Sequence, residues 1–343
     1  MIHWKRALQI AAVYVGTIVG AGFATGKEII EFFSQYGFIG LIGILISGYL
    51  FIFFGVKIMT VSIRIKARSY EQVNNYLFGS FFSPFVNIMM FLMLIGVTSV
   101  MLSGAGAVFQ EHLYVPKLYG VLFTVCLAGL VMIIGTKGLV YVNSFVVPIM
   151  ILFCFYLAIQ VFSLPSFWER IFSDPVAHTK WEGFITPFTY TAFNLALAQA
   201  VLVPLASEVN DEKSVKLGGI IGGAVLTVIL LSNHSVLMML PNFYIYEIPM
   251  AVMMNQLASY LYVAYIFIIY SEIFTSVIGN IYGLERLLHK YVNINRIWIF
   301  VFILFVALII SKMDYGTLLS YLYPLFGYIS LIYMFLLWKK AKN

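Results

Sequence analysis

The chain has 343 residues, of which 62% are hydrophobic and only 10% are charged. Soluble domains carry about 25% charged residues, so this composition excludes an ordinary soluble protein and indicates a polytopic membrane protein. The net charge of +6 reports orientation in such a protein, and we expect no nucleic-acid partner. Cys126 and Cys154 both lie in apolar runs, where we expect small buried hydrophobic residues and neither a disulfide nor a metal site.

The first apolar segment, roughly residues 7–34, is unlike a simple membrane anchor. Glycines and charged residues interrupt it: Gly16, Gly20, Gly22, Gly26, Lys27, Glu28 and Glu31. A glycine costs roughly 1 kcal/mol in a helix interior, and a charge at the bilayer centre costs roughly 2.5 kcal/mol or more. We therefore expect a discontinuous helix, with one half up to about Val19, an unwound piece at 20–22 and then a second half. The alternative is a straight helix whose small residues allow close packing against a neighbour.

Ten apolar segments follow one another along the chain, and a transmembrane helix needs about 20 apolar residues. They span roughly residues 7–34, 37–64, 81–110, 117–136, 138–163, 185–207, 217–240, 259–284, 297–311 and 317–338. With the N-terminus in the cytoplasm, the cytoplasmic loops carry most of the lysines and arginines, as the positive-inside rule requires. We predict an all-α, multi-pass protein of the bacterial inner (cytoplasmic) membrane, with both termini cytoplasmic.

The longest polar interruption divides the chain into two halves of five helices each. We expect a single transmembrane domain over residues 1–343, with a first repeat at 1–163, an external loop at 164–184 and a second repeat at 185–343. If both halves share a fold, the odd helix number requires the second half to be inverted in the membrane, as in inverted-repeat transporters.

This symmetry predicts that helix 6, residues 185–207, is discontinuous like helix 1. Helix 6 carries Asn194, Gln199 and Pro204. Amides within the membrane need partners, and proline lacks an N–H and disrupts the preceding turn. The alternative is ordinary hydrogen bonding of Asn and Gln between continuous helices. The expected fold is thus ten transmembrane helices in a 5+5 inverted repeat.

Helix 8, residues 259–284, places polar groups in the membrane. Glu272, Thr275 and Ser276 stand at spacings of three and four residues, so they share one helix face. A carboxylate with two hydroxyls suits Na⁺, and a membrane-embedded carboxylate could instead carry a proton. The alternative is that Glu272 pairs structurally with Lys27 or Lys57.

Two further regions are candidates for the site. Ser103 lies with other hydroxyl residues and glycines in helix 3 and could face a central cavity. The stretch 241–259, bounded by prolines and rich in aromatic residues, is either a lid or a plain interface loop.

Three motifs resemble LeuT-fold transporters of the amino acid-polyamine-organocation superfamily. They are V-G-x-G at residues 19–22, FNLALAQAV at 193–201 and the hydroxyl pair Thr275–Ser276. The run GTIVGAGFATGKE, beginning at Gly16, is most similar to the bacterial YkvI-type membrane proteins. The ten-helix pattern extends this resemblance over essentially the whole chain.

The resemblance implies a substrate site and a sodium site. The substrate residues would be Gly20, Ala21, Gly22, Phe193, Asn194, Ala196 and Gln199, to which we add Ser103. The sodium ligands would be Gly16, Val19, Thr275 and Ser276. Lys27, Glu28 and Glu272 depart from the sodium-coupled pattern, so they are candidates for proton coupling, and Glu272 is also a candidate ion ligand.

We therefore predict a secondary active transporter of an amino acid or similar small zwitterion, working by alternating access. Na⁺ is the first choice of coupling ion and H⁺ the second, and no cofactor is expected. The alternatives are a receptor of the same fold that senses an amino acid without transporting it, and an ion channel. We find no nucleophile–base pair that indicates an enzyme. The expected partners are a small-molecule substrate and the lipid bilayer, and the oligomeric state stays open.

Overall fold

A computed structural model describes residues 3–134, 137–176, 181–292 and 294–340, and all regular structure in these ranges is helical. The elements are α1 (Trp4–Ile18), α2 (Ala21–Thr25), α3 (Lys27–Phe32), η1 (Ser34–Tyr36), α4 (Gly37–Arg64), α5 (Tyr70–His112), α6 (Lys117–Ile134), α7 (Lys137–Phe162), α8 (Phe167–Ile171), α9 (Glu182–Val209), α10 (Glu212–Met238), η2 (Phe243–Ile245), α11 (Pro249–Leu257), η3 (Ser259–Leu261), α12 (Tyr262–Tyr291), α13 (Arg296–Ile310) and α14 (Tyr315–Lys340). Each predicted apolar segment overlaps one α-helix, except the first, which is a run of three. Helix α5 begins eleven residues before the predicted segment 81–110, and residues 135–136 of the segment 117–136 lie outside the described residues.

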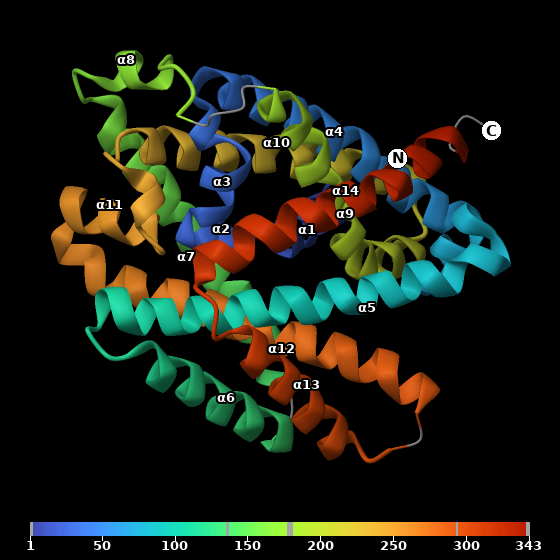
Figure 1. The fold of residues 1–343 in the computed structure, drawn as a ribbon. Helices are drawn as coiled ribbons and strands as arrows, with labels where there is room; N and C mark the ends of the chain where they lie inside the picture. Colours follow the sequence, from blue (N-terminus) through green and yellow to red (C-terminus); the bar gives the residue numbers. More distant parts are fainter. Residues whose placement is uncertain (1–2, 135–136, 177–180, 293, 341–343) are drawn as a thin grey trace.

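Seven helical stretches of the described chain are long and apolar enough to cross a membrane. Helices α6 and α13 are shorter but also apolar. Both ends of the chain lie toward one end of the molecule, with α8 and α11 at the other (Figure 1). The chain is therefore a multi-pass membrane protein, while the ten spans, their inverted repeat and the cytoplasmic termini stay predictions.

The first segment is discontinuous, as predicted. Helix α1 ends at Ile18, and Gly20 is extended, with φ −130° and ψ −167°, before α2 begins. A second break, which was not predicted, follows at Gly26, whose φ of +84° favours glycine because it lacks a Cβ. The segment therefore consists of a long α1 and two short helices joined by a left-handed turn.

The predicted interruption of helix 6 is wrong, because α9 is one continuous helix. Its polar side chains bond to carbonyls of their own helix. The Asn194 amide donates to the Tyr190 carbonyl at 3.1 Å. Pro187 has no N–H for the Gly183 carbonyl, and the Thr186 hydroxyl donates to that carbonyl at 3.3 Å. Polar residues that satisfy the helix from within reinforce it, so they do not mark a break.

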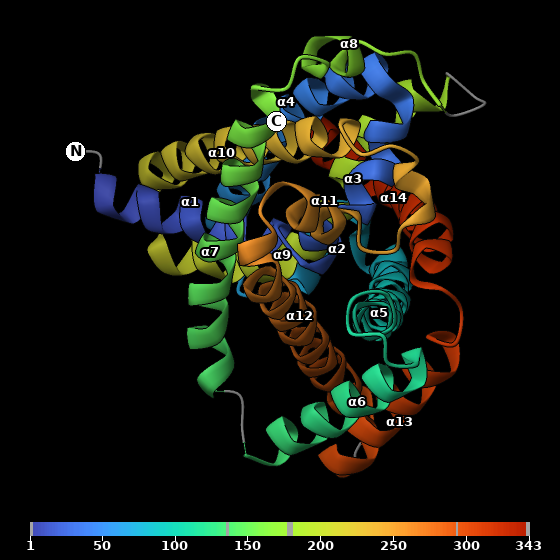
Figure 2. The same ribbon diagram turned by 90° about the vertical axis from the view of Figure 1, so that its left-hand side faces the viewer.

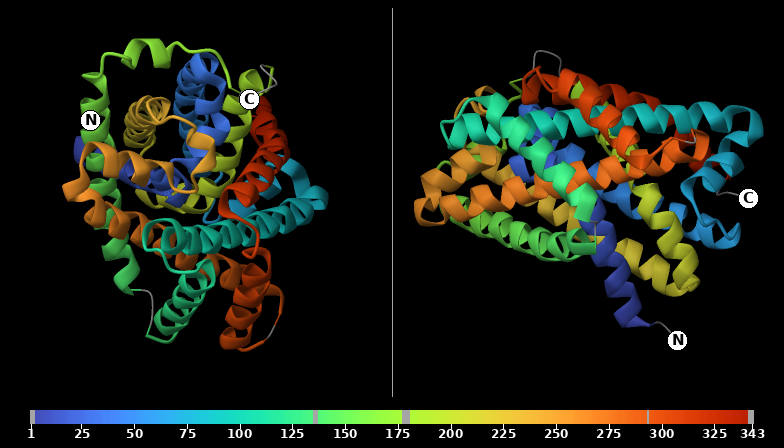
Figure 3. Two further views of the ribbon diagram at one scale, coloured as in Figure 1. Left: turned by 60° about the vertical axis from the view of Figure 1, so that its left-hand side comes forward. Right: turned by 90° about the horizontal axis from the view of Figure 1, so that it is seen from below.

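The helices form two groups. Helices α1, α4, α9 and α10 pack against one another, with α14 on α9. Helices α5 and α12 form the second group, with α6 and α13 on its outer side (Figures 2 and 3). Helix α2 contacts α11 and α12, whereas α3 contacts α9, α10 and α14. The broken segment therefore lies where the two groups meet.

Tyr14 anchors α1 within the first group. Its ring is fully buried, and its hydroxyl donates to the Phe51 carbonyl of α4 at 2.8 Å. Gly55 on α4 and Gly222 on α10 face the ring, and a Cβ at either position would overlap it. Because α1 is fixed in this way, the break at Gly20 separates an anchored helix from the short pieces beyond it.

The two cysteines are free. Cys154 on α7 is buried, as expected, whereas Cys126 on α6 is exposed, contrary to the prediction. Helix α6 lies at the outer side of the bundle, where one of its faces has no protein neighbour to cover it.

Candidate functional site

The left-handed turn at Gly26 folds Glu28 of α3 back over α2. A Cβ placed on Gly22 would overlap Oε2 of Glu28, so the carboxylate lies directly against the backbone of Gly22. Glu28 is only 6% exposed. The turn thus brings together a predicted coupling residue and a predicted substrate residue.

Helices α9 and α14 form the walls around this carboxylate. Asn194 donates from Nδ2 to Oε1 of Glu28 at 3.5 Å. The hydroxyls of Tyr190, Tyr315 and Tyr323 lie within electrostatic reach of the carboxylate. A buried carboxylate is costly unless it is paired, and a positively charged group would supply that pairing.

Phe193, the other predicted substrate residue of this part of α9, faces α14. Its ring centroid lies 4.6 Å from that of Tyr323 and 6.1 Å from that of Phe326. Aromatic rings therefore lie between α9 and α14 on this side of Glu28. Aromatic walls with a few convergent polar groups are typical of small-molecule sites.

One face of α12 lies along the broken segment. The Tyr265 hydroxyl donates to the Ala24 carbonyl of α2 at 3.2 Å. A Cβ on Gly20 would lie 3.9 Å from Oγ of Ser276. Glu272 stands between these two positions on the same face, four residues before Ser276. The structure therefore brings these predicted ion residues to the break.

Glu272 has unusual surroundings for a carboxylate. It is 2% exposed, and its Oε2 has no hydrogen-bond partner among the residues that the structure describes. Thr275 donates to the Glu272 carbonyl at 3.1 Å. Gly16 and Val19 lie at the end of α1, just before the break. Lys27 bonds elsewhere, so the predicted structural pair between Lys27 and Glu272 is not formed.

The remaining predicted substrate residues lie away from Glu28. Ala196 and Gln199 follow Asn194 by two and five residues, which at 3.6 residues per turn places them on another side of α9. They line a groove against α5 and α14, where Gln199 donates to Sδ of Met90 at 3.7 Å. Ser103 donates to the Met313 carbonyl between α13 and α14 at 2.8 Å. The eight residues therefore do not share one pocket. The regular helix α9 turns Ala196 and Gln199 away from Asn194, and Ser103 on α5 bonds to the α13–α14 connection.

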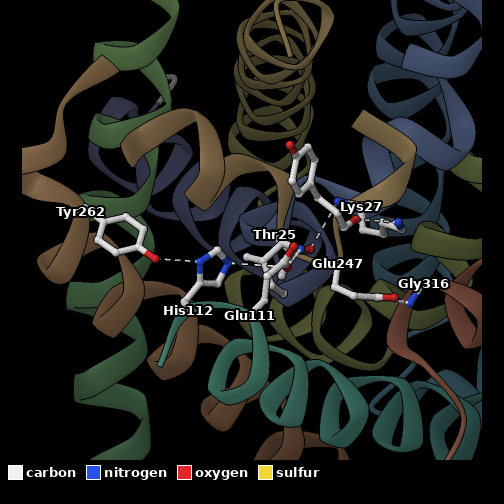
Figure 4. A network of polar contacts seen from close by, with 9 residues as sticks. Thr25, Lys27, Glu111, His112, Glu247, Tyr262 and Gly316 are labelled. Atoms are coloured by element: carbon white, nitrogen blue, oxygen red, sulfur yellow. Dashed lines mark hydrogen bonds and ion pairs between the residues drawn. The ribbon is translucent and has the colours of Figure 1, made fainter. Parts of the chain in front are cut away.

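A polar network that was not predicted joins the broken segment to the loop before α11 (Figure 4). Lys27 donates from Nζ to the carbonyls of Tyr244 and Tyr246 at 3.0 and 2.7 Å. Glu111 accepts from the backbone N–H of Ile248 at 2.8 Å. These three hydrogen bonds hold the loop before α11, and α11 itself packs on α2.

The network continues on both sides. Glu247 accepts from the N–H of Gly316, near the start of α14, at 2.6 Å. His112 shares a hydrogen bond of 2.8 Å with the Tyr262 hydroxyl and lies 3.7 Å from Glu111 (Figure 4). The sequence signal for these residues was weak, since charged side chains at the ends of apolar segments are ordinary. Hydrogen bonds thus tie the stretch 241–259 to α3, α5 and α14, and its helix α11 packs against α2, α7, α10 and α12. This arrangement favours the lid over the plain loop.

No group of three or more His, Cys, Asp or Glu side chains gathers in a metal-ligating arrangement within the described ranges. The two buried carboxylates of interest, Glu28 and Glu272, belong to different helices on either side of the break. Each of these two carboxylates supplies a single negative charge.

Known structures share this fold. Two crystal structures of mutants of a manganese transporter from Eremococcus coleocola superpose with TM-scores of 0.60 and 0.61, at 12% sequence identity. The superposition covers 95% of this chain and 76% of each transporter. At this identity the similarity concerns the fold, which is that of a membrane transporter.

Sequence comparison identifies closer relatives, although no family model matches the chain. The protein YyaD of Bacillus subtilis (strain 168) is 24% identical over 334 residues, which is 96% of this chain and 95% of YyaD. The membrane protein YkvI of the same organism is 46% identical over 336 residues, which is 98% of this chain and 96% of YkvI. The chain therefore belongs to the family of the membrane protein YkvI.

Proposed function

We propose that this protein is a secondary active transporter of a small solute that carries a positive charge, with an amino acid or similar zwitterion as the expected substrate. The observation that carries the proposal is the Glu28 carboxylate lying against Gly22 at the break. A substrate ammonium group would pair with Glu28. A substrate carboxylate would bind the first backbone amides of α2, because the first amides of a helix have no partner within it.

Asn194 and the aromatic wall would set the size of the solute. Asn194 already bonds to both Glu28 and its own helix, so it holds the carboxylate in one orientation. Phe193 and Tyr323 would cover the apolar part of the solute. A zwitterion would find a partner for each charge there: Glu28 for the ammonium group and the first amides of α2 for the carboxylate.

The coupling ion would bind on the α12 side of the break. Glu272 and Ser276 supply oxygen atoms there, and the carbonyls at the end of α1 would complete the shell, as in transporters built on discontinuous helices. Na⁺ is the favoured ion because hydroxyl and carbonyl oxygens suit it. H⁺ is the alternative, with Glu272 as the carrier.

Alternating access would follow from the LeuT-type 5+5 inverted repeat. The loop tied by Lys27, Glu111 and Glu247 would close the side opposite the termini. Opening that side would require Lys27 to release the carbonyls of Tyr244 and Tyr246. The structure would then correspond to a state closed on that side.

A divalent cation is a second candidate substrate. Glu28 and Asn194 are hard oxygen ligands beside unwound backbone, a set that Mg²⁺ or Mn²⁺ accepts. The similarity of fold to manganese transporters favours including Mn²⁺ in any test. A single carboxylate is a weak set for a divalent ion, so the zwitterion remains our proposal.

Uptake into proteoliposomes tests the proposal. Radiolabelled amino acids and Mn²⁺ are presented under an inward Na⁺ gradient, an inward H⁺ gradient or no gradient. We expect gradient-driven accumulation of at least one amino acid. Accumulation of Mn²⁺ alone would replace the zwitterion by the cation. Binding without accumulation would indicate a receptor, and a voltage-driven current without solute would indicate a channel.

A further inference from the structure

A groove on the membrane-facing side of the molecule lies apart from Glu28 and the break. It is bounded by α5, α9 and α14 and has a volume of about 160 Å³. Met90, Met93 and Ala196 form its buried floor. Phe85 and Ile332 stand at its rim and are 62% and 60% exposed, so the groove opens on the outside of the bundle.

The path of α5 shapes one end of the groove. Gly79 interrupts the helix with a φ of +77°, and Phe78 just before it stacks on Tyr333 of α14, with 6.5 Å between ring centroids. Beyond this point Lys340 bonds to the carbonyl of Tyr76. The groove therefore ends near the side of the molecule where the termini lie.

The groove does not suit the proposed solute. Three polar residues line it: Gln199, Ser330 and Tyr333. Oε1 of Gln199 and the Tyr333 hydroxyl are covered by other atoms and have no hydrogen-bond partner among the described residues, and the buried Ser330 hydroxyl donates to Sδ of Met93. The surface that remains open is made of methionine, phenylalanine and aliphatic side chains. A zwitterion placed there would lose its hydration and gain no partner.

The surroundings determine what can reach the groove. Helices α5 and α14 are both apolar enough to span the membrane, so a groove that opens between their outer faces opens into hydrocarbon. The molecules there are lipids, whose chains are as apolar as the groove. Flexible methionine side chains adapt to the irregular shape of such a chain. With a volume of about 160 Å³, the groove has room for a short stretch of one such chain.

We infer that this groove binds one acyl chain of a membrane phospholipid, drawn from the leaflet nearest the termini. The chain would lie against Ala196 of α9 and between α5 and α14. The lipid would thus complete the packing between the helix that carries Asn194 and its two neighbours. Ala196 and Gln199, expected to contact the transported solute, would instead belong to a lipid site.

Photo-crosslinking in liposomes tests this inference. The full-length protein is reconstituted with a phospholipid that carries a diazirine in its acyl chain, and the labelled peptides are identified by mass spectrometry. We expect label on residues 85–93 and 329–333 at several times the level found on the exposed face of α13, marked by Trp298 and Phe305. That face reports ordinary contact with bulk lipid.

Substitutions at the rim provide the matched comparison. Met89→Trp covers the groove, whereas Ile88→Trp adds the same ring on an exposed neighbour that does not line it. We expect Met89→Trp to reduce the groove label at least threefold and Ile88→Trp to leave it unchanged. Both positions are exposed, so folding should survive. Equal labelling of the groove and α13, or no response to Met89→Trp, would overturn the inference, and neither outcome depends on what is transported.

Discussion

The broken segment α1–α3 and the continuous helix α9 carry comparable numbers of unfavourable residues, yet only the first is interrupted. In α1–α3 the unfavourable residues are glycines, and one of them, Gly26, takes a left-handed turn with φ +84°. In α9 they are prolines, threonines and an asparagine. The threonine hydroxyls and the Asn194 amide donate to carbonyls of their own helix. Pro204 lies well inside α9 without ending it.

This difference separates two kinds of polar signal in a membrane helix. A side chain that returns its hydrogen bond to the helix stabilises it, because the bilayer offers no other partner. A glycine has no side chain to bond to a helix carbonyl, and it permits backbone conformations that other residues avoid. In these two segments the break therefore follows the glycines, whereas the asparagine and the prolines of α9 leave the helix continuous.

The largest expected effect concerns Glu28, whose carboxylate the turn at Gly26 places against Gly22. Glu28→Gln removes the charge while keeping the shape of the side chain. A charge-assisted hydrogen bond is worth about 1.5–3 kcal/mol, so we expect the Kd of the transported solute to rise roughly ten- to a hundredfold. Equilibrium binding to the purified protein measures this. Glu31→Gln, on the same short helix, should change Kd little, and an equal effect of both would argue against a specific site at Glu28.

The second prediction tests whether Gly26 is required for the turn. Gly26→Ala meets a left-handed φ and places Cβ 2.6 Å from Cγ of Met250. We expect a loss of about 2 kcal/mol or more in the free energy of unfolding, seen as a lower Tm. Gly279→Ala is the control, because nothing lies within 4 Å of its Cβ, and it should leave Tm unchanged or higher. Equal Tm values for both variants would contradict the turn.

The third prediction distinguishes Gly20, at the break, from Gly22, within α2. Gly22→Ala overlaps Oε2 of Glu28 and must displace the carboxylate, for which we expect about a tenfold rise in Kd, equivalent to ~1.4 kcal/mol. Gly20→Ala meets only an ordinary contact of 3.9 Å with Ser276, and its extended backbone suits any residue. Binding by Gly20→Ala should match the parent protein. The opposite ranking would place the solute at Gly20 rather than at Glu28.

The smallest expected effect lies in α9. Pro204→Ala restores one backbone N–H to a helix that is already continuous, so we expect a gain of about 0.5–1.5 kcal/mol at most and unchanged uptake. Pro187→Ala is the companion variant, where Thr186 already bonds to the freed carbonyl. Loss of uptake by a stable Pro204→Ala protein would show that α9 does bend during transport.

The sequence was a good guide to the helices and to the first break. The second apolar segment, 37–64, has the same bounds as α4 because long apolar runs and their flanking polar residues fix where a membrane helix ends. The break near Val19 followed from the glycines and charges around it. The second break at Gly26 was missed, because a single glycine has no distinctive local pattern.

The candidate site was predicted only in part. Gly22, Asn194 and Glu28 come together, but Glu28 was expected to act in coupling, not beside the substrate residues. Ala196 and Gln199 were assigned to the same pocket because an unwound helix would have let them turn inward. The bonds of Lys27 to Tyr244 and Tyr246 join residues more than 200 positions apart, a pairing that depends on tertiary packing and leaves no pattern in the sequence.

Lys27 and Glu28 are adjacent in the chain, but their side chains make different contacts. The ammonium group of Lys27 holds the loop before α11, and the carboxylate of Glu28 lies against Gly22 of α2. Both sit on a six-residue helix that is joined to α2 by a single glycine. A tilt of this helix that moves Glu28 toward a bound solute must also move Lys27 relative to the carbonyls of Tyr244 and Tyr246. Solute binding at Glu28 and loop closure by Lys27 would then be linked by one coupling free energy, transmitted across one peptide bond. Closure of the loop would change the affinity for the solute by the same factor as the solute changes the closure equilibrium.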